Sequence, residues 1–460
     1  MAKFKMPTAY TILFALILLV AAATWIVPAG EYDYADTVPV ADSYHEVARN
    51  GQGVGDVILA PFSGFYDAVD VAVFILMVGG FLGVVMKTGA VDAGVSAVIQ
   101  RLNGREKWLI PLLMLLFGLG GTTYGMWEET MAFYPLLIPI FLAAGYDAIV
   151  GISVILLGAG AGVICSTVNP FATGIAAGFA GVSLGEGIGL RIAMWVVFEG
   201  AAILYVMAYA AKVKKNPALS VVGSGHEVLH TKAGDAPPLT GRRKAILIVF
   251  ALTFLVMIYG VIPFDEMGLP LPMLGWWFPE LSGLFLVSGI VIGLADRMHE
   301  EDIAEDFVTG AADLLGVAFI IGISRGITTL MNSGKITDTI LHWGENALAG
   351  TGSLVFILLV FLLYLPLSIL IPSSSGLATL SIPIVAPLAK FADIPTALVI
   401  TAFQSASGLI NVITPTAAVV MGALALGRVP YDKWVKYVWK LLALFFLLTL
   451  AFLTVGAWLG

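Results

Sequence analysis

Two adjacent acids interrupt a long apolar tract near its centre. The tract covers residues 108–144 and contains Gly125-Met126-Trp127-Glu128-Glu129-Thr130. A carboxylate at the midplane of a bilayer is energetically costly, so its presence there is by default a hypothesis of function. Glu128 or Glu129 could hold the ammonium group of a bound molecule, exchange a proton or help to bind Na+. The alternatives are a cap on the next half-helix or an ion pair with Arg325, while Trp127 could stack on the bound molecule or simply pack.

A second apolar tract, residues 353–390, is interrupted by hydroxyl groups instead of acids. Its centre reads Pro372-Ser373-Ser374-Ser375-Gly376, and an offset of 245 residues aligns Glu128 with Ser373. The three hydroxyls could bind a ligand, and Gly376 would allow its close approach. The other interpretation is an N-cap with small packing residues, and a cap would not exclude binding.

Two further tracts, 148–182 and 394–427, contain proline breaks. They read Cys165-Ser166-Thr167-Val168-Asn169-Pro170 and Asn411-Val412-Ile413-Thr414-Pro415-Thr416. Proline removes a backbone donor, and the freed backbone groups are tolerated in a bilayer only where they line a cavity or bind something. Side chains at the breaks either contact a ligand or repair the broken backbone hydrogen bonds; these candidates are Ser166, Asn169, Asn411 and Thr414.

The sequence also contains a candidate ion site and one arginine within a predicted span. The oxygens of Thr130, Asn169, Ser375 and Asn411 form a candidate Na+ site, and the sequence predicts no other metal site. Arg325 lies inside a predicted span where the other half of the chain has Gly80. This asymmetry favours a carboxylate partner for Arg325, from the protein or from a bound molecule. Snorkelling or a structural ion pair remain the alternatives.

The composition is that of a polytopic membrane protein. Of the 460 residues, 59% are hydrophobic and 12% are charged, whereas soluble domains carry about 25% charged residues. The net charge of −8 offers no basic surface for nucleic acid, and the single Cys165 excludes an internal disulfide. Helices of about 20 apolar residues span a bilayer, which predicts spans near 9–28, 70–88, 191–212, 244–263, 281–297, 316–332 and 437–458.

The two halves of the chain are weakly similar. Leu136-Leu137-Ile138-Pro139-Ile140, for example, recurs as Leu380-Ser381-Ile382-Pro383-Ile384. Repeats of this kind, with interrupted apolar segments at matching positions, predict two inverted repeats and a binding site between them near the midplane. Lys and Arg gather on one side only if 108–144 and 353–390 are re-entrant hairpins that open to opposite faces. The N-terminus is then cytoplasmic, and residues 30–67 form a solvated external loop.

No catalytic motif is present. The sequence contains no GxSxG, HExxH or Walker A pattern and no cluster among its five histidines. We therefore expect that the protein is not an enzyme and holds no cofactor beyond Na+ or H+ as a coupling ion.

The start of the chain and its four breaks resemble a known family. Phe4-Lys5-Met6-Pro7-Thr8, followed by Trp25-Ile26-Val27-Pro28-Ala29-Gly30-Glu31, is similar to the start of YfcC-type proteins. These proteins are grouped with the C4-dicarboxylate anaerobic carriers (DcuC-like) of the ion transporter superfamily and are often called basic amino acid antiporters. The resemblance covers essentially the whole chain. The superfamily's Ser-Asn-Thr hairpin signature is absent, which puts sodium sites of the dicarboxylate type in doubt.

The resemblance implies a homodimeric secondary transporter of the bacterial inner membrane with an elevator mechanism. Its cargo would be an amino acid, such as arginine or ornithine, carried by exchange or by ion coupling. The alternatives are a Na+- or H+-coupled carrier of C4-dicarboxylates or short-chain carboxylates and, in a different class, a channel. The implied domains are scaffold helices 1–107, transport half 108–182, scaffold helix 183–212, cytoplasmic linker 213–243, scaffold helices 244–352, transport half 353–427 and scaffold helix 428–460.

Overall fold

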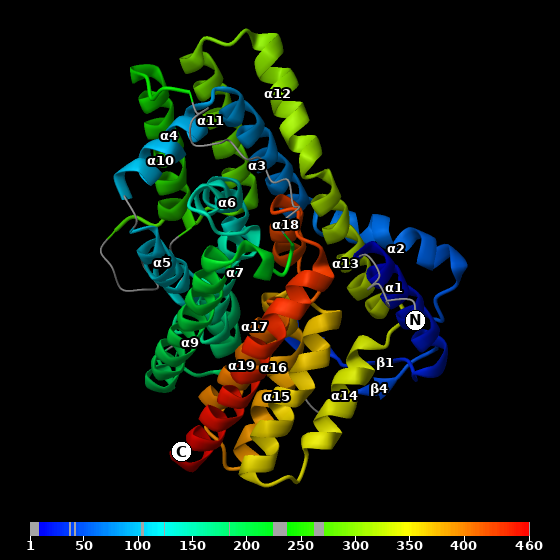
Figure 1. Ribbon diagram of the computed structural model, residues 1–460. Coiled ribbons are helices and arrows are strands. Elements are labelled where there is room, and N and C mark those ends of the chain that lie inside the picture. The colour runs from blue at the N-terminus through cyan, green and yellow to red at the C-terminus, as the bar shows by residue number, and fades with distance from the viewer. Residues whose placement is uncertain are drawn as a thin grey trace, which may run out of the picture.

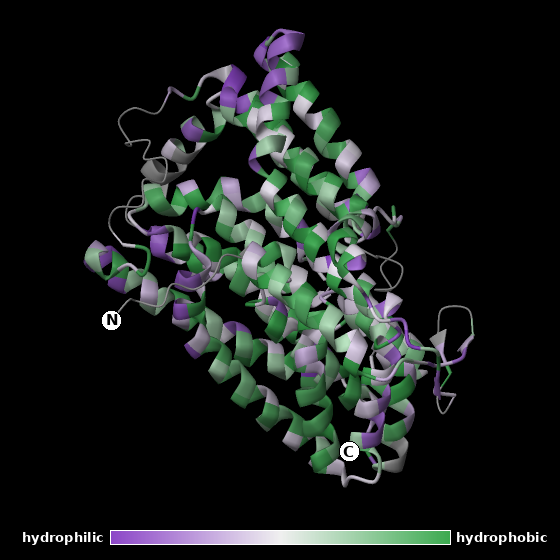
Figure 2. Ribbon diagram, turned by 90° about the vertical axis from the view of Figure 1, so that its right-hand side faces the viewer, coloured by the Kyte–Doolittle hydropathy of each residue, from purple (hydrophilic) through white to green (hydrophobic). Residues whose placement is uncertain are grey.

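The computed structural model describes residues 9–35, 38–40, 43–102, 105–123, 125–183, 185–223, 237–261 and 271–459. The opening residues Phe4 to Thr8 and the centre of the expected linker 213–243 lie outside this part. The described chain forms nineteen α-helices, α1 to α19 (Figure 1), with hydrophobic residues along most of them (Figure 2). Six helices are long and apolar enough to cross a membrane: Val69–Lys87, Ile188–Lys215, Phe278–Asp296, Leu315–Ser333, Ser353–Leu370 and Tyr431–Trp458. The protein is therefore an all-α polytopic membrane protein, as predicted.

One part of the fold is a set of crossed helices that come from both halves of the chain. Two bent units have the same order: α2 (Val54–Asp67) runs into α3 (Val69–Lys87), and α12 (Glu300–Asp313) runs into α13 (Leu315–Ser333). Each unit packs on the other, because α2 contacts α13 and α12 contacts α3; α1 (Ala9–Ile26) adds to α13, and α11 (Phe278–Asp296) adds to α3. Helix α10 (Gly241–Val261) packs on the outside of this set, against α11.

Glycines allow these crossings. A Cβ on Gly64 of α2 would lie 2.1 Å from the backbone nitrogen of Gly326 in α13. A Cβ on Gly310 of α12 would lie 2.3 Å from the carbonyl oxygen of Gly79 in α3. Small residues at such contacts let helix backbones approach closely in a membrane. The prediction of a loop over 30–67 is therefore wrong for α2, whose 14 residues are too short to read as a span but are fixed by this contact.

The later elements also follow one order twice. The first set is α4 (Ala90–Leu102), α5 (Leu109–Thr123), η2 (Glu128–Phe133), α6 (Tyr134–Ala143), α7 (Ala148–Ile164), η3 (Pro170–Gly174), α8 (Ile175–Ala180) and α9 (Ile188–Lys215). The second is α14 (Thr337–Leu348), α15 (Ser353–Leu370), α16 (Ser374–Phe391), α17 (Thr396–Asn411), α18 (Ala418–Leu426) and α19 (Tyr431–Leu459). In both sets the first long helix packs on the helix before the break, α5 on α7 and α15 on α17.

The ends of each expected hairpin lie together. Lys214 Nζ is 3.2 Å from Glu106 Oε2, just before α5, and 4.9 Å from the ring of Tyr146, just after α6. Ser353 Oγ, at the start of α15, donates to the carbonyl of Ala392, just after α16, at 2.7 Å. The two ends of each segment therefore lie at the same end of the helix pair, which is the geometry that a re-entrant hairpin needs.

Helices α9 and α19 pack beside the helices of the two expected hairpins. Helix α9 packs on α5 and α7, and α19 packs on α15 and α17. Phe198 of α9 stacks on Phe445 of α19, with ring centroids 4.6 Å apart. Both helices thus cover apolar faces of α7 and α17.

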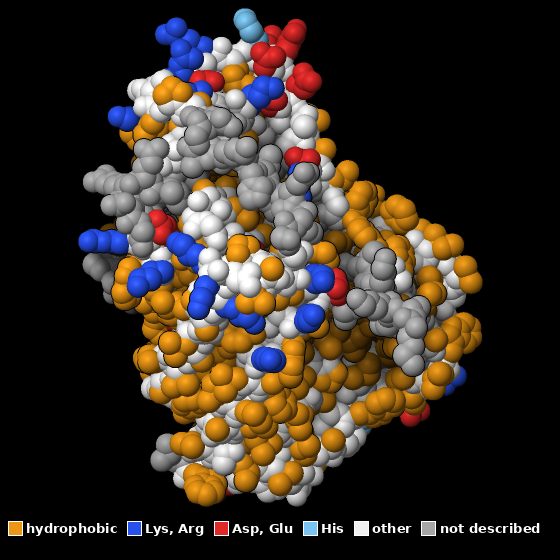
Figure 3. Space-filling model, viewed as in Figure 1, with side chains coloured by type: hydrophobic (Ala, Val, Ile, Leu, Met, Phe, Trp, Pro, Cys, Tyr) orange, Lys and Arg blue, Asp and Glu red, His pale blue; other side chains and the backbone are white. Residues whose placement is uncertain are grey.

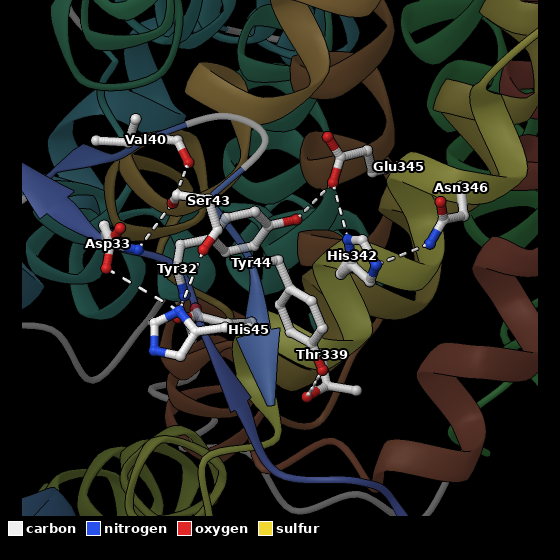
Figure 4. A network of polar contacts seen from close by, with 11 residues as sticks. Tyr32, Asp33, Val40, Ser43, Tyr44, His45, Thr339, His342, Glu345 and Asn346 are labelled. Atoms are coloured by element: carbon white, nitrogen blue, oxygen red, sulfur yellow. Dashed lines mark hydrogen bonds and ion pairs between the residues drawn. The ribbon is translucent and has the colours of Figure 1, made fainter. Parts of the chain in front are cut away.

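The chain before α2 folds over α14 (Figures 1 and 4). Strand β1 (Gly30–Glu31) pairs with β4 (His45–Glu46), and β2 (Tyr34–Ala35) pairs with β3 (Val38–Pro39). Tyr44 stacks on His342 of α14 with ring centroids 4.0 Å apart, and the Tyr32 hydroxyl donates to Glu345 at 2.8 Å. Burial, together with this hydrogen bond, raises the pKa of Tyr32. This segment is therefore structured against α14, where the sequence predicts only a solvated loop.

Candidate functional site

The four breaks meet at one cavity. Its volume is about 150 Å³, and both hairpin tips and both broken helices reach it together with α3, α11 and α13. The lining residues used below are Val71, Gly125, Trp127, Glu128, Glu129, Asn169, Phe171, Trp277, Ser324, Arg325, Ser373, Ser374, Ser375, Asn411 and Thr416. The cavity thus lies between the crossed helices and the body that contains the hairpins.

The first tip is a tight turn held by its own side chains. The backbone N–H of Trp127 donates to Glu129 Oε2 at 3.1 Å, and Thr130 Oγ1 donates to the carbonyl of Trp127 at 2.5 Å. Gly125 has a positive φ of 79°, and a Cβ there would lie 2.5 Å from Asn169 Oδ1. Glycine is therefore required where the tip meets the first break. Glu128 is partly exposed and lines the cavity.

The first break is closed by internal hydrogen bonds. Asn169 Oδ1 accepts from the backbone N–H groups of Phe171 at 2.8 Å and Ala172 at 3.3 Å, and its Nδ2 donates to Ser166 Oγ at 3.1 Å. The carbonyl of Ser166 accepts from Gln404 Nε2 of α17 at 2.9 Å. The polar groups of this break are thus used mainly within the break itself, and the Ser166 carbonyl also ties it to the second half of the fold.

The second tip presents a helix N-terminus to the cavity. Helix α16 begins at Ser374, and the Ser373 hydroxyl caps it by accepting from the N–H of Gly376 at 3.2 Å. The first turn of a helix carries free N–H groups and a partial positive charge, so it favours anionic groups. Ser374 and Ser375 add hydroxyls at the same place.

The second break leaves an acceptor free. Asn411 is 7% exposed, and its Oδ1 is buried with no hydrogen-bond partner in the described part of the chain. The freed backbone is satisfied elsewhere: Trp434 Nε1 donates to the carbonyl of Val412 at 3.1 Å, and the Tyr431 hydroxyl donates to that of Ile413 at 2.7 Å. A buried acceptor without a partner is costly, so Asn411 has the chemistry to accept from a ligand in the cavity.

Arg325 brings the positive charge. It projects from α13, and its Nε is 4.0 Å from Asp67 Oδ2, a carboxylate whose side chain is 58% exposed. An ion pair this long and this exposed leaves the guanidinium largely available. Arg325 therefore faces the same cavity as Glu128 and the α16 N-terminus.

Most predicted site residues reach the cavity, and four do not. Trp127, Glu128, Glu129, Asn169, Arg325, Ser373, Ser374, Ser375 and Asn411 line it. The others lie behind its wall because their polar groups complete local hydrogen bonds; these are Thr130, Ser166, Gly376 and Thr414, the last through its contact with Thr416 Oγ1 at 2.8 Å. Of the four groups of the candidate Na+ site, Asn169, Ser375 and Asn411 line the cavity, and Thr130 does not.

Other lining residues were not predicted. Trp277, just before α11, contacts Phe171, and their ring centroids are 4.8 Å apart. Ser324 donates to the carbonyl of Thr416 at 2.8 Å, next to Arg325. These residues come from α11 and α13, which are distant in sequence from the breaks. The only signal in the sequence was Arg325 itself, because Ser324 is its neighbour.

The cavity offers both acceptor groups and positively charged donor groups. Glu128, Glu129 and Asn411 Oδ1 supply acceptors, which suit ammonium or guanidinium groups. Arg325 and the N-terminus of α16 supply donors and positive charge, which suit a carboxylate. A small molecule carrying both kinds of charge would meet a partner for each.

Comparisons with known proteins agree on the class. Residues 6–457 match the family described as DcuC, C4-dicarboxylate anaerobic carrier. An uncharacterized protein of Haemophilus influenzae is 35% identical over 95% of this chain and 94% of its own, and an Escherichia coli protein named "Putative basic amino acid antiporter YfcC" is 31% identical over 97% and 95%.

Two solved structures are similar in outline. They are the Alcanivorax borkumensis YdaH transporter, with a TM-score of 0.47 and 16% identity over 99% of this chain and 98% of its own, and Neisseria gonorrhoeae MtrF, described with antimetabolite efflux pumps, with 0.45 and 18% over 98% and 95%. The class is decided by the family match over residues 6–457 and by the two relatives that are 35% and 31% identical over nearly the whole chain. The chain is a membrane transporter and belongs to the C4-dicarboxylate anaerobic carrier family.

Proposed function

We propose that the protein is a secondary active transporter of the bacterial inner membrane whose cargo is a basic amino acid, such as arginine or ornithine. The observation that carries this proposal is the unpaired Asn411 Oδ1 in one cavity with Glu128, Glu129 and Arg325. Three acceptor side chains (Glu128, Glu129 and Asn411) and one cationic side chain (Arg325) match a molecule with two cationic groups and one carboxylate. The name of the Escherichia coli relative, a putative basic amino acid antiporter, points the same way.

The binding pose follows from the charges. The α-carboxylate of the cargo lies at Ser374 and the α16 N-terminus, within reach of Arg325. The α-ammonium and the cationic side chain then face Glu128, Glu129 and Asn411. Each buried charge thereby gains a partner, as a site of low dielectric requires.

The movement is proposed to be of the elevator type. The cavity has walls from α3, α11 and α13 on one side and from the tips and breaks on the other. The matching order of the elements and the exchanged contacts α2–α13 and α12–α3 support an inverted repeat. Since α9 and α19 pack on the hairpins, we include them in the moving body. A homodimer, a cytoplasmic N-terminus and a coupling ion, Na+ or H+, belong to the same proposal.

The second candidate cargo is a C4-dicarboxylate or a short-chain carboxylate. Arg325 beside the α16 N-terminus favours it, because both attract carboxylates. Two neighbouring glutamates oppose it, since a dianion would face like charges.

Transport by the purified protein in liposomes separates these candidates. Uptake of labelled arginine is measured with and without preloaded ornithine, and labelled succinate is the parallel arm. We expect saturable arginine uptake that preloaded ornithine accelerates, with little succinate uptake. Succinate uptake without arginine flux would refute the amino acid assignment, and flux that never saturates would indicate a channel.

A further inference from the structure

A second cavity lies at the opposite end of the first hairpin from its tip. Its volume is about 420 Å³, and it is formed between the start of α5 and the last turns of α9. Its walls combine apolar and basic side chains: Lys107, Ile110, Tyr146, Met207, Ala210, Ala211, Lys214 and Lys215. It shares no lining residue with the cavity described above.

The charge around this cavity is strongly positive. Arg105, Lys107, Lys212, Lys214 and Lys215 lie within these two short stretches. Glu106 is buried and is already bound by Lys214 at 3.2 Å. The other nearby acid, Asp147, accepts from the hydroxyls of Tyr209 and Ser220, both at 2.6 Å. Within the described residues, Lys107 and Lys215 therefore have no carboxylate partner.

The position of the cavity is that of a membrane surface. Trp108 is 62% exposed, and Lys107 Nζ lies 5.8 Å from its ring centroid. Exposed tryptophan beside lysine is typical of the boundary between lipid headgroups and acyl chains. From this level an exposed apolar surface continues into the membrane along Leu112 and Leu116 of α5 and Leu204 of α9. Figure 3 shows Lys and Arg side chains gathered in a band over this part of the molecule, with hydrophobic side chains beyond it.

We propose that this second cavity binds one anionic phospholipid. Its phosphate lies between Lys107 and Lys215, and an acyl chain follows Ile110, Met207 and Ala211 to the exposed apolar surface. The basic rim matches the headgroup charge, and the apolar wall matches the chain, a combination that a free anion would not use. Because Lys214 joins both ends of the first hairpin, the lipid would brace the hairpin at its open end.

The test is lipid binding by the purified protein in a neutral detergent. Native mass spectrometry and thermal unfolding are followed during titration with dioleoylphosphatidylglycerol, with dioleoylphosphatidylcholine, and with inorganic phosphate alone. We expect one retained phosphatidylglycerol and a saturable rise in the unfolding temperature with that lipid only. About 1 kcal/mol per lysine near an anionic surface corresponds to roughly 30-fold weaker binding for Lys107→Gln combined with Lys215→Gln.

Two further variants separate the alternatives. Lys440 is the matched control, because its Nζ also lies 5.8 Å from a tryptophan ring, Trp439, yet it lines neither cavity; Lys440→Gln should bind normally. Ala211→Trp fills the apolar wall while leaving every lysine, and it should abolish lipid binding. Equal effects of the two lipids, or equal losses in Lys440→Gln, would overturn the proposal. Stabilisation by phosphate alone that survives Ala211→Trp would identify a free-anion site instead.

Discussion

Two asparagines at matching breaks are predicted to respond in opposite ways to the same substitution. Asn169, directly before Pro170, has its side chain occupied within the protein, whereas Asn411, four residues before Pro415, has an Oδ1 without a partner among the described residues. Asn169→Ala removes three hydrogen bonds of about 0.5–1.5 kcal/mol each, so we expect a loss of roughly 2–4 kcal/mol in the free energy of unfolding. Asn411→Ala removes an acceptor with no partner, and the expected change is within about 1 kcal/mol.

The effect on binding is reversed. If Asn411 Oδ1 accepts from a cationic group of the cargo, that hydrogen bond contributes about 1.5–3 kcal/mol. Its loss raises the KM for arginine in liposomes by roughly 10- to 150-fold. Unfolding of both variants is measured by SDS titration in mixed micelles, with arginine counterflow in parallel. If Asn411→Ala unfolds as easily as Asn169→Ala, or transports arginine with an unchanged KM, the assignment of Asn411 as a free ligand group is refuted.

Three other substitutions test separate contacts. Glu128→Gln should abolish arginine uptake while leaving the unfolding transition unchanged. Normal uptake by this variant would show that Glu128 does not bind the cargo. Ser373→Ala should cost about 1 kcal/mol in SDS unfolding because it removes the α16 cap, whereas Ser374→Ala should cost nothing in stability; equal costs would contradict the capping assignment. Gly118→Ala places a Cβ 2.5 Å from Glu199 Oε2, so we expect about 1–3 kcal/mol of destabilisation that Glu199→Ala relieves. An additive double variant would show that the two residues do not touch.

The sequence predicts the breaks because their cause is local. A continuous apolar helix does not accommodate Pro170, Pro415 or the polar tips at 127–130 and 373–376. The number of breaks and their place near the centre of each tract can therefore be predicted from the sequence. The order of the helices follows in the same way from apolar length. Residues of both tips and both breaks line one cavity, and Arg325 joins them from α13.

What the sequence does not predict depends on packing between distant segments. Asn169 directly precedes Pro170, whereas Asn411 lies four residues before Pro415. Neither motif shows which side chain is occupied, because that depends on the backbone N–H groups that the fold places around each one. Trp277 resembles a membrane-surface anchor, although α11 places it on the cavity opposite Phe171. Helix α2 is short and contains Pro61, so it is recognised only through its contact with α13.

The two halves of the fold supply a common frame, and their differences supply the charge of the cavity. At matching positions the first half has Glu128 where the second has Ser373, and the second half has Arg325 where the first has Gly80. A site built from identical halves would offer the same groups twice and would suit a symmetric cargo. Here the acids come from one half and the guanidinium and capped helix N-terminus from the other, so the cavity distinguishes the two ends of its ligand. That polarity is the physical reason to expect an amino acid in preference to a symmetric dicarboxylate.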